Sequence, residues 1–259
     1  MPMNETLQLI HNRRSVRAYS PKPVTRSDKD AILAAAFRAP TAGNLMLYSI
    51  IEVEDQAIKD RLAVSCDHQP FIARAPYVLL FLADLQRWWD YFIKCQAPQR
   101  AEADGLPNRK PQTGDLLLAC CDALISAQTA VIAAESLGIG SCYIGNVLEQ
   151  YETHRETFGL PPYTLPVTML CFGYPTEAAA KRKLTSRFPR ESIVNKDRYR
   201  QLDAAALENC FHDMENAFRG TAGAGRYENA GQEIYCRKFA AGFSLELNRS
   251  VGKMLENWK

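Results

Sequence analysis

The sequence predicts an α/β or α+β sandwich, in which strands and helices intermix around a hydrophobic core. Three observations predict this class. Aliphatic runs typical of buried strands occur at 75–84 and 164–175, helical patterns separate the strands, and the composition is that of an ordinary globular protein, with 47% hydrophobic and 23% charged residues. A chain of 259 residues can form one large domain or two small ones.

The first third of the chain contains clear helix boundaries. A short helix precedes Arg13. Thr25 and Asp28 form a capping-box pattern before an alanine-rich helix, and Pro40 ends that helix, so residues 40–44 lie in a turn. The runs that follow predict a strand, a helix and a fully buried strand, at 48–53, 55–66 and 75–84.

The middle of the chain carries one long apolar segment, 116–138. At about 1.5 Å per residue it is long enough to cross a bilayer. However, Asp122, Gln128 and Glu135 interrupt it, and no second span or flanking basic loop accompanies it. We therefore expect a central helix that is buried against a sheet or a partner subunit. Before it, the aromatic and then Pro-rich stretch 86–114 predicts a helical excursion and a loop.

The second half of the chain contains one more strand and a helical tail. Residues 138–145 (GIGSCYIG) are no dinucleotide-binding loop, because Tyr143 stands in place of the third glycine and the segment follows a helix. They instead indicate a close-packed connection between helix and strand. Residues 164–175 form the strand, and helical patterns follow residue 199, interrupted by a Gly-rich break at 220–225. We expect one domain over 1–200 and a helical C-terminal extension over 201–259 that packs on the core or on a dimer partner.

Charge balance and cysteine spacing argue against several functions. A net charge of +2 gives no general electrostatic basis for binding nucleic acid or an anionic membrane. The first residues show neither a secretory signal nor a lipidation pattern, so we expect a cytoplasmic protein. The eight cysteines form no CxxC pair, which argues against zinc, and those in apolar segments are expected as reduced structural thiols.

Two short motifs are candidates for ligand binding. Residues 13–17 (Arg-Arg-Ser-Val-Arg) place three guanidinium groups and a hydroxyl close together, which can hold a phosphate, although by itself the cluster is better explained by a solvated turn. Residues 40–44 (Pro-Thr-Ala-Gly-Asn) are small enough to let the backbone approach a planar ligand, or simply form the turn that ends a helix. A second basic group at 181–190 could supply one or two phosphate ligands.

The order of these motifs is more specific than any one of them. RRSVR, APTAGN, a long helix ending in SLGIGSCYIG, then LPVTMLCFGYP and a basic loop follow one another over residues 6 to about 200. This succession resembles the nitroreductase family of flavoproteins, and QPFIARAPYVLLFLADLQRW and RFPRESIVNKDRY are similar to its oxygen-insensitive, NADPH-preferring branch. The resemblance implies an α+β sandwich with a mostly antiparallel sheet flanked by helices. Two subunits would intertwine as a homodimer with two FMN sites at their interface, and residues 1–200 would form the FMN-binding domain.

The resemblance also assigns residues to the phosphate end of an FMN site. Arg13 and Ser15 would hold the phosphate together with Arg187. Arg14 would help to position the ribityl chain and the ring through its backbone. Thr185 stands where close relatives often carry a second basic phosphate ligand, so another basic side chain would have to compensate.

At the ring end, the resemblance places Arg17 near N1 and O2 of the isoalloxazine, where it would tune the ring electrostatically, and Gln69 at the pyrimidine edge. The other assigned residues would bring backbone or small side chains to the ring: Ile144, Gly145 and Asn146 near N5, and Pro40, Thr41, Ala42 and Asn44 from the partner subunit.

The implied activity is electron transfer from NAD(P)H through FMN to a nitroaromatic, quinone or flavin acceptor by a ping-pong mechanism. No side chain is needed as a nucleophile, the four histidines form no evident relay, and no metal is expected. A flavin-binding or storage protein without efficient turnover is the alternative, because ligand residues do not distinguish binding from catalysis. A basic module at 181–200 for nucleic acid or a membrane surface is a second alternative. The sequence decides neither the physiological acceptor nor the choice between NADH and NADPH.

Overall fold

The computed structural model describes residues 3–221 and 225–259, and the chain divides into two compact units. The first unit comprises Met1–Arg182 together with Glu246–Lys259, and the second is Lys183–Leu245. The division therefore falls before the expected boundary at residue 200, and the end of the chain belongs to the first unit. The expected Gly-rich break at 220–225 lies partly outside the described residues.

The first unit is built on a four-stranded antiparallel sheet with strand order β1-β2-β4-β3. Its register shifts between Phe81 and Leu82 of β2, where Leu82 pairs with Pro166 and one residue of β4 bulges out. A bulge suits this position because proline has no amide hydrogen for the ladder. The strands are β1 (Tyr48–Glu52), β2 (Tyr77–Asp84), β3 (Gly140–Ile144) and β4 (Thr164–Gly173).

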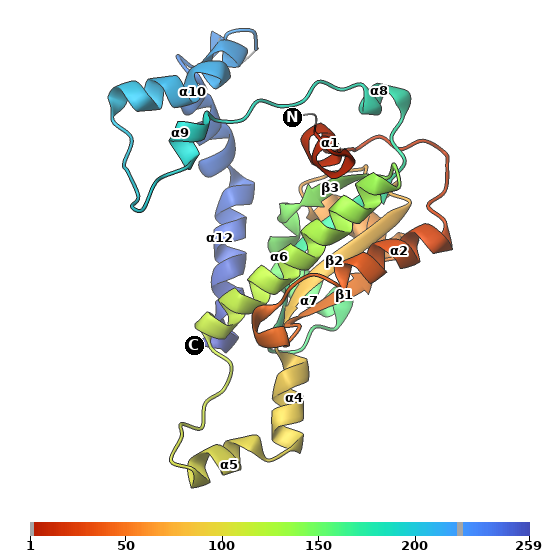
Figure 1. The fold of residues 1–259 in the computed structure, drawn as a ribbon, viewed down its shortest axis with the longest axis vertical. Helices are drawn as coiled ribbons and strands as arrows, with labels where there is room; N and C mark the ends of the chain where they lie inside the picture. Colours follow the sequence, from red (N-terminus) through yellow and green to blue (C-terminus); the bar gives the residue numbers. More distant parts are fainter. Residues whose placement is uncertain (1–2, 222–224) are drawn as a thin grey trace. The chain divides into compact units, whose positions relative to one another are not determined.

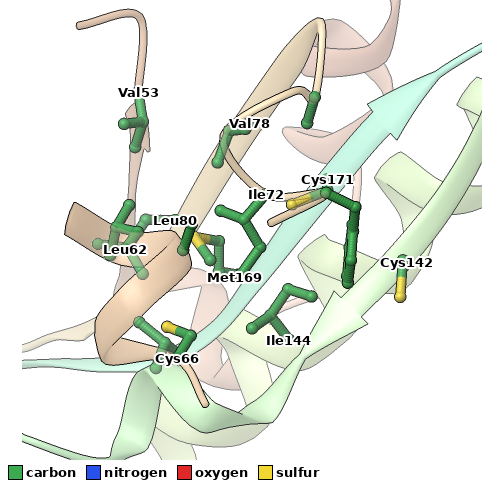
Figure 2. Close-up of a cluster of buried hydrophobic side chains, with 14 of the residues drawn as sticks. Val53, Leu62, Cys66, Ile72, Val78, Leu80, Cys142, Ile144, Met169 and Cys171 are labelled. Atoms are coloured by element: carbon green, nitrogen blue, oxygen red, sulfur yellow. The ribbon is translucent and has the colours of Figure 1, made fainter. Parts of the chain in front are cut away.

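Hydrophobic side chains cover both faces of the sheet, which explains why β2 reads as a continuous apolar run. Along β2, Val78, Leu80 and Leu82 point into a cluster with α3 (Gln56–Ser65). Figure 2 shows part of this cluster. The alternate residues pack in a second cluster with α2 (Arg26–Ala36) and α6 (Thr113–Ser136). The α+β fold with an antiparallel sheet among helices is thereby confirmed.

The remaining elements of the first unit surround this sandwich (Figure 1). The capping box predicted before α2 is present, since Thr25 Oγ1 accepts from the Asp28 amide at 3.1 Å and Asp28 Oδ2 accepts from the Thr25 amide at 2.9 Å. The short helix at 151–158 was not predicted, because it is polar and buries only two side chains. The other elements are α1 (Glu5–Asn12), η1 (Ala42–Asn44), α4 (Gln86–Lys94), α5 (Ala97–Ala103), η2 (Gly145–Leu148), α7 (Tyr151–Phe158) and α8 (Glu177–Ala180).

The long apolar helix expected at 116–138 is α6, and it crosses the sheet with α2 beside it (Figure 1). Small residues face the sheet, and Ala127, Ala130 and Ala134 are completely buried there. In the described part of the chain, α6 is the one helix long and apolar enough to pass as a membrane span. One side of it is packed in the core, whereas the other side exposes Leu117, Leu118, Cys121, Leu124 and Ile125.

All eight cysteines are free thiols within the described residues. Cys66, Cys142 and Cys171 lie in the cluster of Figure 2, as expected for structural thiols in apolar surroundings. Cys121 differs from that expectation, because it points outward from α6 and is exposed in the single chain.

The last segment of the chain supports the first unit. Trp258, in η5 (Leu255–Trp258), is fully buried beside Leu116 of α6. The Ser250 hydroxyl accepts from the Tyr151 amide at 3.0 Å and donates to the Leu148 carbonyl at 2.6 Å. Ser250 belongs to α12 (Gly242–Met254), so this helix holds η2 and the start of α7 in place.

The second unit is helical. It contains α9 (Arg190–Ile193), α10 (Ala204–Phe218), α11 (Ala230–Ile234) and the π-helical turn η4 (Tyr235–Phe239). The rings of Phe188 and Phe211 pack edge to face, with their centroids 5.1 Å apart.

Candidate functional site

The N-terminal motif lies along the edge strand β3. Ser15 bridges Ser141 in parallel, and the Val16 amide donates to the Ser141 carbonyl at 2.9 Å. Val16 is buried directly against Gly140, where an added Cβ would lie 2.3 Å from its side chain. The glycine is therefore required for this close approach. Because side chains alternate along an extended segment, the burial of Val16 turns Ser15 and Arg17 the other way.

Near Ser15 the structure leaves polar groups without partners. Arg13 Nη1 and Ser141 Oγ are both buried and form no hydrogen bond within the described structure. A buried guanidinium nitrogen without an acceptor is costly unless a ligand supplies one. These donors suit a phosphate, so the residues present fit the phosphate end of FMN.

The side chain of Arg14 is engaged within the chain. Its guanidinium donates to the carbonyls of Ala180 and Arg182 at 2.5 and 2.7 Å. It thereby ties the start of the chain to the segment after α8. The predicted role of Arg14 uses its backbone, and this arrangement turns the side chain toward other segments of the same chain.

Glu135 lies on α6 near the two arginines. Its Oε1 is buried without a hydrogen-bond partner. Burial raises the pKa of its carboxyl to about 7, although the charges of Arg13 and Arg14 act in the opposite direction. At neutral pH this carboxyl is therefore poised between its neutral and charged forms beside the candidate phosphate site.

The raised pKa of Glu135 predicts a pH-dependent stability. The folded protein binds this proton more tightly than the unfolded chain, so stability falls as the pH rises from about 4.5 to about 7. We expect Glu135→Gln to remove this loss and to stabilise the protein by about 1 kcal/mol at pH 8, with little change at pH 4.5, allowing for screening by solvent. Denaturant unfolding at pH 4.5 and pH 8 measures this change in stability. The control is Glu156→Gln, because Glu156 is exposed. Parallel pH profiles of Glu135→Gln and the unmodified protein would contradict the assignment.

The far end of β3 carries the ring-end candidates. Ile144 is buried, so only its backbone is available, whereas Gly145 is exposed and an added Cβ there would meet nothing within 4 Å. Asn146 Oδ1 accepts from Gln69 Nε2 at 3.1 Å. A tight turn after α3 brings Gln69 there, and its backbone amide donates to the Ala63 carbonyl at 2.7 Å. The fold thus brings Gln69 next to Asn146, which follows Ile144 and Gly145 in sequence.

Arg17 lies at this ring end. Its guanidinium carbon is 5.8 Å from the centre of the Phe71 ring, two residues after Gln69. Arg17 is also close to Cys142 of β3. Burial raises the pKa of the Cys142 thiol, and the positive charge of Arg17 lowers it. Ser141 and Ile144 are three residues apart, or about 10 Å along the strand. The two ends of the candidate site therefore follow β3.

The turn at 40–44 is held by Asp122, a residue of α6 that is 2% exposed. Asp122 accepts from the Ala42 amide at 2.9 Å and from the Leu47 amide at 3.1 Å. Gly43, Asn44 and Met46 all have positive φ, 54°, 57° and 49°, a conformation that glycine and asparagine tolerate but that is strained for methionine. The carboxylate therefore fixes a turn that would otherwise relax.

Helix α4 also supports this turn through hydrogen bonds. Trp88 Nε1 donates to the Leu45 carbonyl at 2.6 Å, and Arg87 Nη1 donates to the Met46 carbonyl at 3.4 Å. Leu45 and Met46 themselves are exposed. They give the surface of the turn an apolar character.

One chain does not bring all predicted residues together. Asp122, which holds the turn 40–44, and Glu135, near Arg13, are thirteen residues apart on α6, or about 20 Å at the rise of a helix. The turn therefore lies far along α6 from the N-terminal cluster of the same chain. Arg187 belongs to the second unit, where its guanidinium donates to Thr185 Oγ1 at 2.7 Å.

Sequence reasoning did not identify the role of two acidic residues at these sites, Asp122 and Glu135. Asp122 and Glu135 were noted only as interruptions of an apolar helix. A carboxylate on the buried face of such a helix is itself a signal, because it needs partners from another element. In the part of the chain that the structure describes, no cluster of His, Cys, Asp and Glu could hold a metal ion.

Comparison with known proteins identifies related sequences. A model of the nitroreductase family matches residues 10–174. The oxygen-insensitive NADPH nitroreductase of Salmonella typhimurium is 32% identical over 205 residues, 79% of each chain. The FMN reductase (NADPH) of Bacillus subtilis is 30% identical over 199 residues, 76% of this chain and 75% of the relative.

Solved structures agree with these matches. A nitroreductase from Bacillus subtilis superimposes with a TM-score of 0.79 at 25% identity, covering 98% of this chain and 100% of its own. An NADPH:FMN oxidoreductase from Vibrio harveyi, solved with NAD+, has a TM-score of 0.76 at 23% identity, covers 97% and 98% of the two chains, and shares the fold.

Proposed function

The chain belongs to the nitroreductase family, and we propose that it transfers electrons from NAD(P)H through bound FMN to nitroaromatic, quinone or flavin acceptors. It is an NAD(P)H nitroreductase/FMN reductase-like oxidoreductase. The observation that carries the FMN proposal is the alignment of two sets of groups along β3. A buried guanidinium nitrogen without an acceptor lies at one end, and an open glycine with two ordered amides lies at the other.

FMN, when bound, supplies an atom, N5, that accepts and releases hydride. The residues of the chain would bind and tune it. Arg13 and Ser15 would hold its phosphate, Gln69 would bind its pyrimidine edge, and the backbone at Gly145 would contact the ring. Arg17 contributes a positive charge where negative charge gathers on reduction, so it favours the reduced state electrostatically. We propose that both substrates use one pocket in turn, which gives ping-pong kinetics.

The site is completed, in this proposal, by a second copy of the chain. Within one chain the turn 40–44 lies about 20 Å along α6 from the residues near Arg13. A ligand that contacts both therefore needs the turn of a partner subunit. The exposed apolar face of α6 around Leu117 and Leu124 offers a surface for that partner. We further propose that the protein acts in the cytosol, where its eight thiols stay reduced.

The acceptor is proposed as a class. Relatives of this chain are named as an NADPH nitroreductase, FMN reductases and a Cr(VI) reductase. Leu45 and Met46 expose apolar side chains next to the turn that would face the ring. This surface favours a planar, weakly polar acceptor such as a nitroaromatic, a quinone or a second flavin.

The purified protein tests the proposal. We expect it to be yellow and to release noncovalent FMN on heating, which mass spectrometry identifies. It should oxidise NADPH with a quinone or nitroaromatic acceptor. Double-reciprocal plots of the rate should give parallel lines, as a ping-pong mechanism requires. Release of FAD, or no uptake of FMN, would overturn the cofactor. FMN binding without NADH or NADPH oxidation would instead support a flavin-storage protein.

Arg17→Ala separates binding from chemistry. We expect the midpoint potential of bound FMN to fall and reduction by NADPH to slow about tenfold to 150-fold, because a charge-assisted contact of about 1.5 to 3 kcal/mol is lost in the reduced state. Stopped-flow absorbance and a redox titration measure these effects. Arg187→Ala, the matched variant, should mainly weaken FMN affinity. If Arg17→Ala loses FMN but whatever remains bound is reduced at the normal rate and potential, Arg17 is a phosphate ligand.

A further inference from the structure

A chain of hydrogen bonds runs from the buried carboxyl of Glu149 to Gln69. Glu149 is 4% exposed, and its Oε1 accepts from Asn146 Nδ2 at 2.6 Å. Asn146 Oδ1 in turn accepts from Gln69 Nε2 at 3.1 Å, and the same nitrogen donates to the Cys66 carbonyl at 2.8 Å. Three side chains from two segments of the sequence are thus linked in one line.

The Glu149 carboxylate fixes the orientation of Asn146 and, together with the Cys66 carbonyl, that of Gln69. An ionised carboxylate only accepts hydrogen bonds, so Asn146 must turn its NH2 group toward Glu149 and its oxygen toward Gln69. Gln69 must then present its own NH2 group, and both hydrogens are used by Asn146 and Cys66. The Gln69 carbonyl oxygen is consequently the end of the line that remains for a ligand. Without Glu149, the Asn146 amide could flip by 180°, and Gln69 would be oriented by the Cys66 carbonyl alone.

The position of Glu149 is unfavourable for the carboxylate itself. Burial raises the pKa of its carboxyl, and the nearby charges of Asp67 and Glu246 raise it further. No lysine or arginine pairs with it among the described residues. Its hydrogen bond to Asn146 is the stabilising contact that opposes this cost. A buried acid without a cation is thus retained where it orients a neighbouring amide.

We propose that Glu149 is a positioning residue that acts through Asn146 to aim the Gln69 carbonyl oxygen at the N3–H group of the flavin. The inference rests on the proposed function, since it takes FMN as the ligand. The pyrimidine edge of an isoalloxazine presents one donor, N3–H, between two carbonyl oxygens, and an oriented acceptor matches that donor. Glu149 thereby makes the site select rings that carry a proton at this position.

The test uses the holoprotein loaded with FMN carrying 15N at N3, because NMR then reports the exchange of the N3 proton with water. In the unmodified protein we expect a protected N3–H signal. Glu149→Leu should make this proton exchange at least about tenfold faster and weaken FMN affinity about tenfold. Glu149→Gln should restore protection, since its carbonyl can accept from Asn146. Glu156→Leu, on the exposed side of α7, is the matched control.

Each outcome decides the inference. If Glu149→Leu does not retain FMN, Asn146→Ala replaces it and should show the same fast exchange. Protection that persists in Glu149→Leu or Asn146→Ala, or a Glu149→Gln variant that behaves like leucine, overturns the role of Glu149 and leaves the proposed function intact. An unmodified protein that takes up no FMN overturns the proposed function and this inference together.

Discussion

The double variant Leu117→Asp/Leu124→Asp is expected to be a folded monomer that has lost FMN. Both leucines lie on the outward face of α6, 67% and 45% exposed in the single chain, so the change should leave the core intact. In a two-fold dimer it would place four unpaired carboxylates in an apolar interface, and each buried charge costs several kcal/mol. We expect dimer affinity to fall more than about 1,000-fold.

Light scattering combined with flavin absorbance measures both effects. The control is Val64→Asp, because Val64 is 58% exposed on α3, the helix on the opposite face of the sheet. The control should remain a yellow dimer. A double variant that stays dimeric with FMN bound would exclude the α6 face as the interface, and a monomer that keeps FMN would exclude a site shared between chains.

Asp122→Ala is expected to lower both the stability of the protein and its affinity for FMN, the second largest effect that we predict. It removes the acceptor of the Ala42 and Leu47 amides, one partly and one fully buried, and each unsatisfied amide costs about 1 to 3 kcal/mol. We expect the free energy of unfolding to fall by about 2 to 4 kcal/mol. The turn 40–44 should also relax, because the neighbouring Met46 is strained at positive φ and the Asp122 contact to the Leu47 amide no longer holds it there. FMN affinity should therefore fall along with stability.

Denaturant unfolding and FMN titration follow these two quantities. Asp122→Asn keeps one carbonyl oxygen as an acceptor and should lie between the alanine variant and the unmodified protein. Asp104→Ala is the control, since its ion pair with Arg100 is exposed and should contribute less than about 1 kcal/mol. Equal stability of Asp122→Ala and Asp104→Ala would show that the turn does not depend on the carboxylate.

Secondary structure could be predicted where one local signal dominates. The capping box at Thr25, the aliphatic run of β2 and the length of α6 each reflect short-range chemistry, and each is present in the structure. The helix at 151–158 carries no such signal. It is held by distant groups, such as the Ser250 hydroxyl, and a sequence window does not contain them.

The candidate site could likewise be predicted only where its residues are close together in the sequence. Arg13, Ser15 and Arg17 are recognisable because they are close in sequence and chemically unusual together. Their juxtaposition with Gln69 and Asn146 depends on β3, which brings segments more than fifty residues apart onto one line. Proximity of that kind results from strand pairing.

By itself, the sequence determined the fold class and the family, and it predicted the residues that would bind a flavin, because alternation, caps and motif order are properties of neighbouring residues. Only the tertiary structure decided how those residues are held. It showed that Asp122 accepts from two amides of the turn, that a buried Glu149 is linked through Asn146 to Gln69, and that about 20 Å of α6 separates the turn from the N-terminal cluster. The physical reason is that a buried polar group must find its partner in space, and that partner can belong to any segment the core brings near.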